Sequence, residues 1–257
     1  MSRTITPTAW LRVLRPDPVP RHHVVCLPPG GGSATTYRSL AEHLGPGYVV
    51  AAVQYPGRQD RLADTAIPDI GELADRIAAE LLAQPRIEHL SLFGHSMGAT
   101  VAFETTRRLE RDGQPPELLF VSGRPAPDHR ESARLHLGPD DGLIDDLERL
   151  AADPGPVRML RTEPGLADLV LPAVRNDYRA VETYAYQPGP ALTVDITAFV
   201  GTSDPTTTAA QLDRWSEFTT GAFSSTQFPG GHFYLDDRPA EVATAIRNRA
   251  DGRATRR

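Results

Sequence analysis

The stretch Leu90–Thr100 constrains the chain most, because it reads Leu-Ser-Leu-Phe-Gly-His-Ser-Met-Gly-Ala-Thr. An apolar run precedes a Gly-x-Ser-x-Gly pattern, and a helix-compatible run, residues 101–109, follows it. In such an elbow, Gly94 and Gly98 let a strand and a helix close tightly, which forces the serine between them into a strained backbone geometry. The pattern predicts a strand, a sharp turn and a helix that present Ser96 as an exposed nucleophile, with an ordinary glycine-rich turn as the alternative.

Length and charge narrow the class of protein. A chain of 257 residues and 28.0 kDa with 40% hydrophobic residues can bury one substantial core. We expect a single domain over residues 1–257 with an insertion at about 124–184. The net charge of −6 and the pI near 5.7 argue against binding to nucleic acid, which requires a concentrated basic surface.

Several features that the sequence lacks indicate which cofactors and which cellular location to expect. Cys26 is the only cysteine, so no internal disulfide can form, and its apolar neighbours indicate a buried thiol. The sequence has no His-Glu-x-x-His motif or cysteine pair, and we expect no metal or cofactor. The N-terminus lacks the apolar core of a signal peptide, and no run approaches the roughly 18 apolar residues of a membrane span. We therefore expect a cytoplasmic protein with no membrane partner.

Strand patterns alternate with helical patterns along the chain. Strands are expected at 10–14 (an edge strand), 24–27, 48–53, the run before Gly94, 118–122, 194–200 and 224–228. Helices are expected at 35–44, 70–82, 101–109, 207–219 and 238–250, and Asp69 is placed to cap the second of these. This alternation predicts an α/β fold with a mostly parallel central sheet and helices on both faces.

Strand patterns disappear between Gly123 and about Tyr184. Two helical stretches are expected there, at 140–152 and 166–184, separated by Pro154-Gly155-Pro156. We interpret the segment as an inserted helical lid. Its apolar residues could line a tunnel or simply pack together, and periodicity does not distinguish the two: Leu143, Ile144, Leu147, Leu150, Leu169, Val170, Val174, Tyr178 and Val181.

A glycine-rich loop, Pro28–Ser33, follows the expected strand at 24–27. Its three glycines let the backbone bend close to a ligand and point amide N–H groups inward. A phosphate-binding P-loop would end in Gly-Lys-Ser/Thr, but this chain contains no lysine. The loop is therefore interpreted as one side of an oxyanion hole, with the N–H groups of Gly30 and Met97 as donors, and a plain tight turn is the alternative.

A serine nucleophile needs an imidazole to take its proton and a carboxylate to orient that imidazole. In α/β-hydrolases the acid and then the histidine follow the serine, on loops at the carboxyl ends of strands. Asp204, in a Gly-Thr-Ser-Asp-Pro turn, and His232, in a Pro-Gly-Gly-His-Phe loop, fit this order. Asp236 and Asp237 are rivals for the acid, although so short a loop would have to fold back; Asp204 could also be a mere turn residue. His95 lies inside the elbow and is interpreted as a packing or hydrogen-bonding residue.

Several segments match one family together: Leu27–Ala34, Gln54–Arg58, Gly94–Ala99, Ser122–Pro127, Arg175–Tyr178 and Gly230–Phe233. From about Val24 to the final helix, the chain resembles the type II thioesterases, the stand-alone editing enzymes of modular polyketide and nonribosomal peptide synthases. The elbow alone is shared by many hydrolases, whereas the Gln-Tyr-Pro-Gly-Arg, Ser-Gly-Arg-x-Ala-Pro and Arg-x-Asp-Tyr segments are far more specific. One departure is Pro29-Gly30, where the family usually has His-Ala, but a backbone donor does not depend on the side chain.

This resemblance implies an α/β-hydrolase fold with a flexible helical lid. It also implies hydrolysis of acyl groups from the phosphopantetheine arm of an acyl or peptidyl carrier protein, through a Ser-His-Asp triad and an acyl-enzyme. Because carrier proteins are acidic and this chain is acidic too, docking would use a local arginine or apolar patch, for which Arg58 and Arg61 are candidates. We expect a monomer, since the sequence has no heptad pattern or long exposed edge that demands an oligomer.

Two other kinds of protein fit the same residues. One is a carboxylesterase or a cyclising acyltransferase with the same triad, which would differ in its leaving group and product. The other is a module that binds carrier proteins without catalysis. The substitution Ser96→Ala distinguishes this module from an enzyme, because a module without catalysis would keep its biological effect when the serine is removed.

Overall fold

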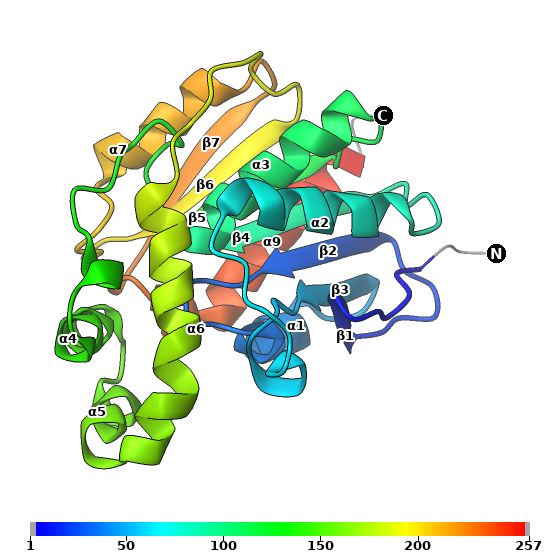
Figure 1. Ribbon diagram of the computed structural model, residues 1–257. Coiled ribbons are helices and arrows are strands. Elements are labelled where there is room, and N and C mark those ends of the chain that lie inside the picture. The colour runs from blue at the N-terminus through cyan, green and yellow to red at the C-terminus, as the bar shows by residue number, and fades with distance from the viewer. Residues whose placement is uncertain (1–3, 255–257) are drawn as a thin grey trace.

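The computed structural model describes residues 4–254, which form a seven-stranded sheet with helices packed around it (Figure 1). The strands are β1 (Leu11–Arg15), β2 (His22–Leu27), β3 (Tyr48–Val53), β4 (Leu90–His95), β5 (Leu118–Ser122), β6 (Asp195–Gly201) and β7 (Phe223–Phe228). Their order across the sheet is β1-β3-β2-β4-β5-β6-β7. The edge strand β1 pairs antiparallel with β3, and the other pairs are parallel. The sheet is therefore mostly parallel, as the alternation predicted.

Helices cover both faces of the sheet. One face carries α2 (Ile70–Leu82) and α3 (Met97–Arg111), and the other carries α1 (Arg38–Leu44) and α9 (Pro239–Ala254) (Figure 1). Two short helices, α7 (Ala209–Asp213) and α8 (Tyr234–Asp237), follow β6 and β7. Each face has its own apolar cluster, so the five central strands, β2 to β6, are buried on both sides.

Local sequence explains where α2 begins and which face it buries. The Asp69 side chain accepts a hydrogen bond from the Glu72 N–H at 2.7 Å, which satisfies one of the free donors at the helix start. The apolar residues recur at helical spacing and are buried against the sheet: Ile70, Leu73, Ala74, Ile77, Ala78 and Leu81. Both features agree with the predicted capped helix at 70–82.

The insertion between β5 and β6 differs from the prediction in its number of helices. It contains α4 (Asp140–Leu150), α5 (Gly155–Thr162) and α6 (Pro164–Thr183), where two helices were expected. The predicted separator Pro154-Gly155-Pro156 instead starts α5, with a proline in its first turn. Proline is favoured there because its missing N–H has no partner at a helix start and its fixed φ suits the helix. The three helices share a small apolar cluster centred on Ile144, Leu160 and Leu171.

Other boundaries shifted by smaller amounts. The expected helices at 35–44 and 207–219 each divide into a 3₁₀ segment and an α-helix, with the 3₁₀ segments at Ala34–Tyr37 and Arg214–Phe218. Cys26 is fully buried in β2, as predicted, and burial raises the pKa of its thiol. Within residues 4–254, no helix is both long and apolar enough to cross a membrane. The division into one domain with an insertion stays a prediction.

Candidate active site

Ser96 occupies the sharp turn between β4 and α3. Its φ of 53° and ψ of −122° form a strained conformation for a residue with a side chain, and its N–H donates to the Ser122 carbonyl at 2.8 Å. A Cβ added to Gly94 would lie 2.1 Å from the Gly98 carbonyl oxygen, and one added to Gly98 would lie 2.0 Å from that of Leu27. Only glycine fits at these two positions, which is the backbone geometry that the Gly-x-Ser-x-Gly pattern predicted.

The carboxyl ends of the neighbouring strands β6 and β7 bring Asp204 and His232 together. His232 Nδ1 lies 2.9 Å from Oδ2 and 3.1 Å from Oδ1 of Asp204, and both side chains are almost fully buried. Burial alone would raise the pKa of Asp204, but the hydrogen bonds from His232 and Thr206 hold it below its ordinary value. The carboxylate is therefore ionised at neutral pH. The rivals Asp236 and Asp237 lie exposed on α8.

Thr206 is a second partner of this pair that the sequence analysis missed. Its N–H and its hydroxyl each donate to Asp204 Oδ1 at 2.8 Å, and its hydroxyl oxygen lies 3.2 Å from His232 Nδ1. The signal available in the sequence was its place two residues after an aspartate, where an aspartate side chain commonly accepts a backbone hydrogen bond. These bonds fix the rotamer of the carboxylate that faces the imidazole.

His95 packs beneath His232, as expected for a histidine inside the elbow. Its Nδ1 lies 2.9 Å from the Ser122 hydroxyl oxygen, and its ring centre is 4.9 Å from that of His232. Burial, together with the nearby His232 charge, lowers the pKa of His95 well below its ordinary value. A neutral imidazole at this position does not repel a proton on His232.

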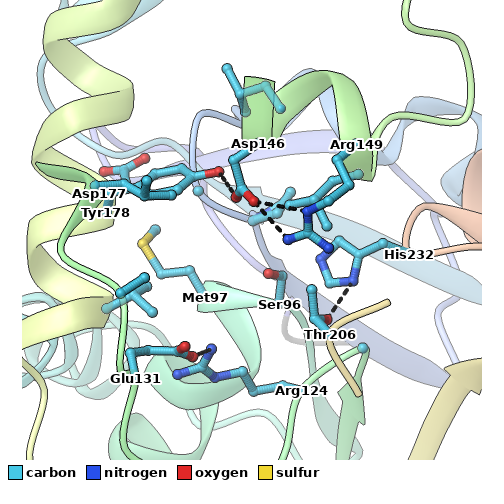
Figure 2. A pocket seen from close by; sticks show the side chains of 18 of the residues that line it. Ser96, Met97, Arg124, Glu131, Asp146, Arg149, Asp177, Tyr178, Thr206 and His232 are labelled. Carbon is cyan, nitrogen blue, oxygen red and sulfur yellow. Dashed lines mark hydrogen bonds and ion pairs between the residues drawn. The ribbon is translucent and has the colours of Figure 1, made fainter. Parts of the chain in front are cut away.

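Ser96, His232, Gly30 and Met97 line one cavity of about 290 Å³ (Figure 2). Figure 2 shows Ser96 between Met97 and His232 among the residues that line this cavity. The structure therefore brings all of the predicted triad and oxyanion residues to one place, apart from the buried Asp204, which reaches the cavity through His232. The catalytic role of each residue stays a prediction.

The helical insertion supplies much of the cavity wall. Of the apolar residues that could have lined a tunnel or packed together, four line the cavity: Leu147, Leu150, Tyr178 and Val181. Others are used in packing, because Ile144 and Val170 join the apolar cluster of the insertion. Leu169 is 52% exposed. Both interpretations of the periodicity thus hold, and Leu147 both lines the cavity and packs against the apolar cluster.

Charged side chains at the cavity are arranged in pairs. The Arg124 guanidinium donates to Glu131 at 2.6 Å, and that of Arg149 donates to Asp146 at 2.6 Å. The Tyr178 hydroxyl donates to the other Asp146 oxygen at 2.7 Å (Figure 2). Burial, followed by the Asp146 charge, raises the pKa of Tyr178, so the phenol keeps its proton. The pairs leave the wall polar but internally neutralised.

The glycine-rich loop faces the insertion as well as the cavity. The Gly31 N–H donates to Asp177 Oδ2 at 2.8 Å, which leaves the Gly30 and Met97 amides as the cavity-lining candidates for an oxyanion hole. Arg58 holds the same Asp177 carboxylate through two bonds of 2.6 and 2.7 Å. Two of the more specific family segments, Gln54–Arg58 and Arg175–Tyr178, therefore meet at this ion pair.

The expected docking role of Arg58 and Arg61 was wrong. Arg58 is only 7% exposed, and its two terminal nitrogens are engaged with Asp177 and the Gly32 carbonyl. The Arg61 side chain is 12% exposed and donates to Asp64 and to the Gln54 carbonyl. Sequence position alone could not show that both guanidinium groups are used inside the fold.

Comparisons with known proteins agree with this geometry. The chain matches the model of the Thioesterase domain family over residues 22–249. A protein of Streptomyces griseus named "Probable cadicidin biosynthesis thioesterase" is 40% identical over 242 residues, which cover 94% of this chain and 66% of that protein, just under two thirds of its length. Thioesterase PikA5 of Streptomyces venezuelae is 39% identical over 238 residues, which cover 92% of this chain and 84% of that protein.

A solved structure extends the similarity to the fold. The type II thioesterase BorB from the borrelidin biosynthetic cluster superimposes with a TM-score of 0.86 at 41% identity, covering 96% of this chain and 100% of that chain. This confirms the predicted α/β-hydrolase architecture. The chain belongs to the thioesterase family, and its structure is that of a type II thioesterase.

Proposed function

We propose that this protein hydrolyses acyl thioesters carried on the phosphopantetheine arm of acyl or peptidyl carrier proteins, and so edits modular polyketide or nonribosomal peptide synthases. The observation that carries the proposal is a strained serine in the same cavity as a buried His232–Asp204 pair. Ser96 is the nucleophile, His232 the general acid and base, and Asp204 the group that orients His232. The names of the relatives, which place them in biosynthetic clusters, support a carrier-bound substrate.

Acylation begins when His232 takes the proton of the Ser96 hydroxyl and the oxygen attacks the thioester carbonyl carbon. Negative charge then develops on the carbonyl oxygen, where the N–H groups of Gly30 and Met97 stabilise it. As the carbon–sulfur bond breaks, the imidazolium returns its proton to the leaving sulfur. The free pantetheine thiol departs, and the acyl group remains as an ester on Ser96.

Deacylation uses the same groups with water in place of serine. His232 takes a proton from a water molecule, and the oxygen attacks the ester carbonyl. The bond to Ser96 breaks, the proton passes to the serine oxygen, and a free acid is released. Asp204 stabilises the imidazolium in both halves because it is ionised and fixed by Thr206.

The test compares two substrates with one enzyme. A carrier protein loaded with a short acyl group and a simple oxygen ester are each incubated with the protein, and free acid is measured by mass spectrometry. Ser96→Ala should abolish acid release from the carrier. Ser91→Ala is the matched control, because it removes a buried hydroxyl of β4 that bonds to His22 outside the cavity; it should retain turnover.

Each other outcome identifies a different protein. Oxygen-ester hydrolysis without turnover of the carrier thioester indicates a carboxylesterase with the same triad. When the carrier bears a longer acyl chain with a terminal hydroxyl or amine, a cyclic product in place of the free acid indicates a cyclising acyltransferase, because that group attacks the acyl-enzyme instead of water. Carrier binding without acid release from the wild-type protein indicates a module without catalysis.

The proposal includes the setting of the enzyme. Its substrate is held on a synthase, so it works in the cytoplasm with that synthase. We expect a monomer, since the edge strand β7 is short and presents polar side chains, Ser224, Ser225, Thr226 and Gln227, so the sheet has no long apolar edge there. Size-exclusion chromatography with light scattering measures this directly.

A further inference from the structure

We propose that Asp177 is a positioning residue that makes the oxyanion hole depend on the placement of the helical insertion. Asp177 lies on α6, yet its carboxylate accepts the N–H of Gly31, the neighbour of the donor Gly30. This inference rests on the proposed function, because it takes the Gly30 amide as an oxyanion donor. It adds a residue of the insertion to the groups that control turnover.

Helix α6 packs directly on the oxyanion loop. A Cβ added to Gly30 would lie 3.6 Å from the Asp177 Cβ, and one added to Gly31 would lie 3.2 Å from a methyl carbon of Val174. Gly31 has a φ of 74°, and the Gly32 N–H closes a tight turn onto the Pro29 carbonyl at 2.9 Å. The direction of the Gly30 amide is therefore set by a short turn whose centre is bound to Asp177.

Arg58 makes this anchor rigid. Its two terminal nitrogens bond to the two Asp177 oxygens at 2.6 and 2.7 Å, and one of them also donates to the Gly32 carbonyl at 3.0 Å. The pair is buried, with Arg58 7% and Asp177 1% exposed. A bidentate, buried pair holds both groups in one geometry, and removing one partner is destabilising because it leaves the other charge buried and unpaired. The Asp177–Arg58 pair therefore binds the loop at two points, the Gly31 N–H and the Gly32 carbonyl.

The same turn of α6 also forms the cavity wall. Tyr178, next to Asp177, donates a hydrogen bond to Asp146 of α4. Figure 2 shows Asp177 and Tyr178 on one helix, α6, above Ser96 and Met97. If α6 moves away from the loop, the Gly31 N–H loses its acceptor and the Gly30 amide loses its fixed direction. The oxyanion hole is consequently complete only when the insertion is seated on the cavity, so hydrolysis is coupled to the closed arrangement.

The first test is Asp177→Asn, which keeps the shape of the side chain but places an amide N–H₂ group against the Arg58 guanidinium. We expect kcat for an acyl-carrier substrate to fall about 10- to 100-fold, with KM changed less than about threefold. Glu104→Gln is the matched control. Glu104 is a buried carboxylate on α3 that bonds to Arg107 and Arg108 away from the cavity, so this variant should lose stability but keep kcat.

A second measurement separates positioning from general weakening of the fold. A trifluoromethyl ketone analogue of the acyl-pantetheine forms an oxyanion on Ser96, whereas the corresponding pantetheine amide binds without one. Asp177→Asn should weaken binding of the ketone by the same factor by which it lowers kcat, and it should leave binding of the amide unchanged. Arg58→Lys retains a positive charge but cannot form the bidentate pair, and it serves as the second variant if Asp177→Asn fails to fold. It should lower kcat and weaken ketone binding while amide binding stays unchanged.

The outcomes distinguish this inference from the proposed function. Normal kcat in the Asp177→Asn and Arg58→Lys variants, or equal losses for ketone and amide, would overturn the positioning role while an inactive Ser96→Ala variant still supports the triad. A kcat loss in Glu104→Gln equal to that in Asp177→Asn would also overturn it. Retained hydrolysis in Ser96→Ala would overturn the proposed function itself.

Discussion

Mild acid should destabilise this protein through two buried histidines at the start of β2. His22 and His23 are each 5% exposed, and burial lowers the pKa of each from 6.5 to about 4. His22 bonds to the Ser91 hydroxyl and faces His89, whose charge would oppose its protonation. Both ring nitrogens of His23 lack a hydrogen-bond partner in the described part of the chain. Both imidazoles are therefore held neutral by the fold.

The sign and size of the effect follow from linkage. Between pH 6.5 and about 4 the unfolded chain binds protons that the folded chain does not, so stability falls as the pH falls through this window. The contribution is fully present above pH 6.5 and lost near pH 4. At 1.36 kcal/mol per pH unit, each of His22 and His23 accounts for about 3 kcal/mol, a large part of the roughly 5–15 kcal/mol that stabilises a typical domain.

Urea unfolding at pH 7.5, 6.0, 5.0 and 4.5 measures this loss. The variant His23→Leu removes one of three buried histidines whose pKa the fold lowers, the others being His22 and His95. The fall in unfolding free energy across the window should therefore shrink by about a third. His43→Gln is the matched control, because His43 is exposed on α1; it should leave the profile unchanged. A profile that is flat from pH 7.5 to 4.5, or one that His23→Leu does not alter, would refute the reasoning.

Three further predictions concern the cavity. Gly30→Ala should keep kcat within about threefold, because the added Cβ makes an ordinary contact. Gly31→Ala should lower the unfolding free energy by about 1–2 kcal/mol and lower kcat, because the φ of Gly31 is 74°. Steady-state kinetics and thermal melts check both variants. Thr206→Val removes a charge-assisted bond to the carboxylate beside His232 and should lower kcat about 10-fold, with the acidic limb of the pH–rate profile moving to higher pH. Carriers loaded with acetyl or propionyl groups should be hydrolysed about 10-fold faster than malonyl-loaded carriers, because Arg124 and Arg149 are already paired and a carboxylate would have to break a pair; competing substrates in one reaction measure the ratio.

Sequence reasoning located the sheet and the candidate catalytic groups because both depend on local or topological rules. Gly94 and Gly98 report a backbone approach that no side chain permits, so their spacing around Ser96 carries structural information directly. The order of acid and histidine along the chain then selects Asp204 and His232, which the carboxyl ends of adjacent parallel strands bring together. Their catalytic role stays a prediction, which Ser96→Ala and Thr206→Val test.

The parts that sequence reasoning missed depend on contacts between distant segments. Arg58 and Asp177 are 119 residues apart, and each alone resembles an ordinary surface charge until the fold buries them together. The proline pair around Gly155 is compatible with both a helix break and a helix start, and packing of α5 on its neighbours decides between them. The insertion was therefore predictable as helical, but its arrangement over the cavity was not.

Turnover and acyl selection are divided between two structural layers that meet at one loop. The sheet fixes the strain at Ser96 and the bond between His232 and Asp204, and the insertion forms part of the cavity wall with residues such as Leu147 and Val181. Changes to that wall alter which acyl groups fit and leave the reacting groups in place. Under the proposed positioning role, a change at Asp177 acts differently: because its carboxylate binds the Gly31 N–H beside the proposed donor Gly30, the change should slow hydrolysis of every acyl group by a common factor. The comparison of wall variants with Asp177→Asn across several acyl groups therefore separates selection from catalysis within one cavity.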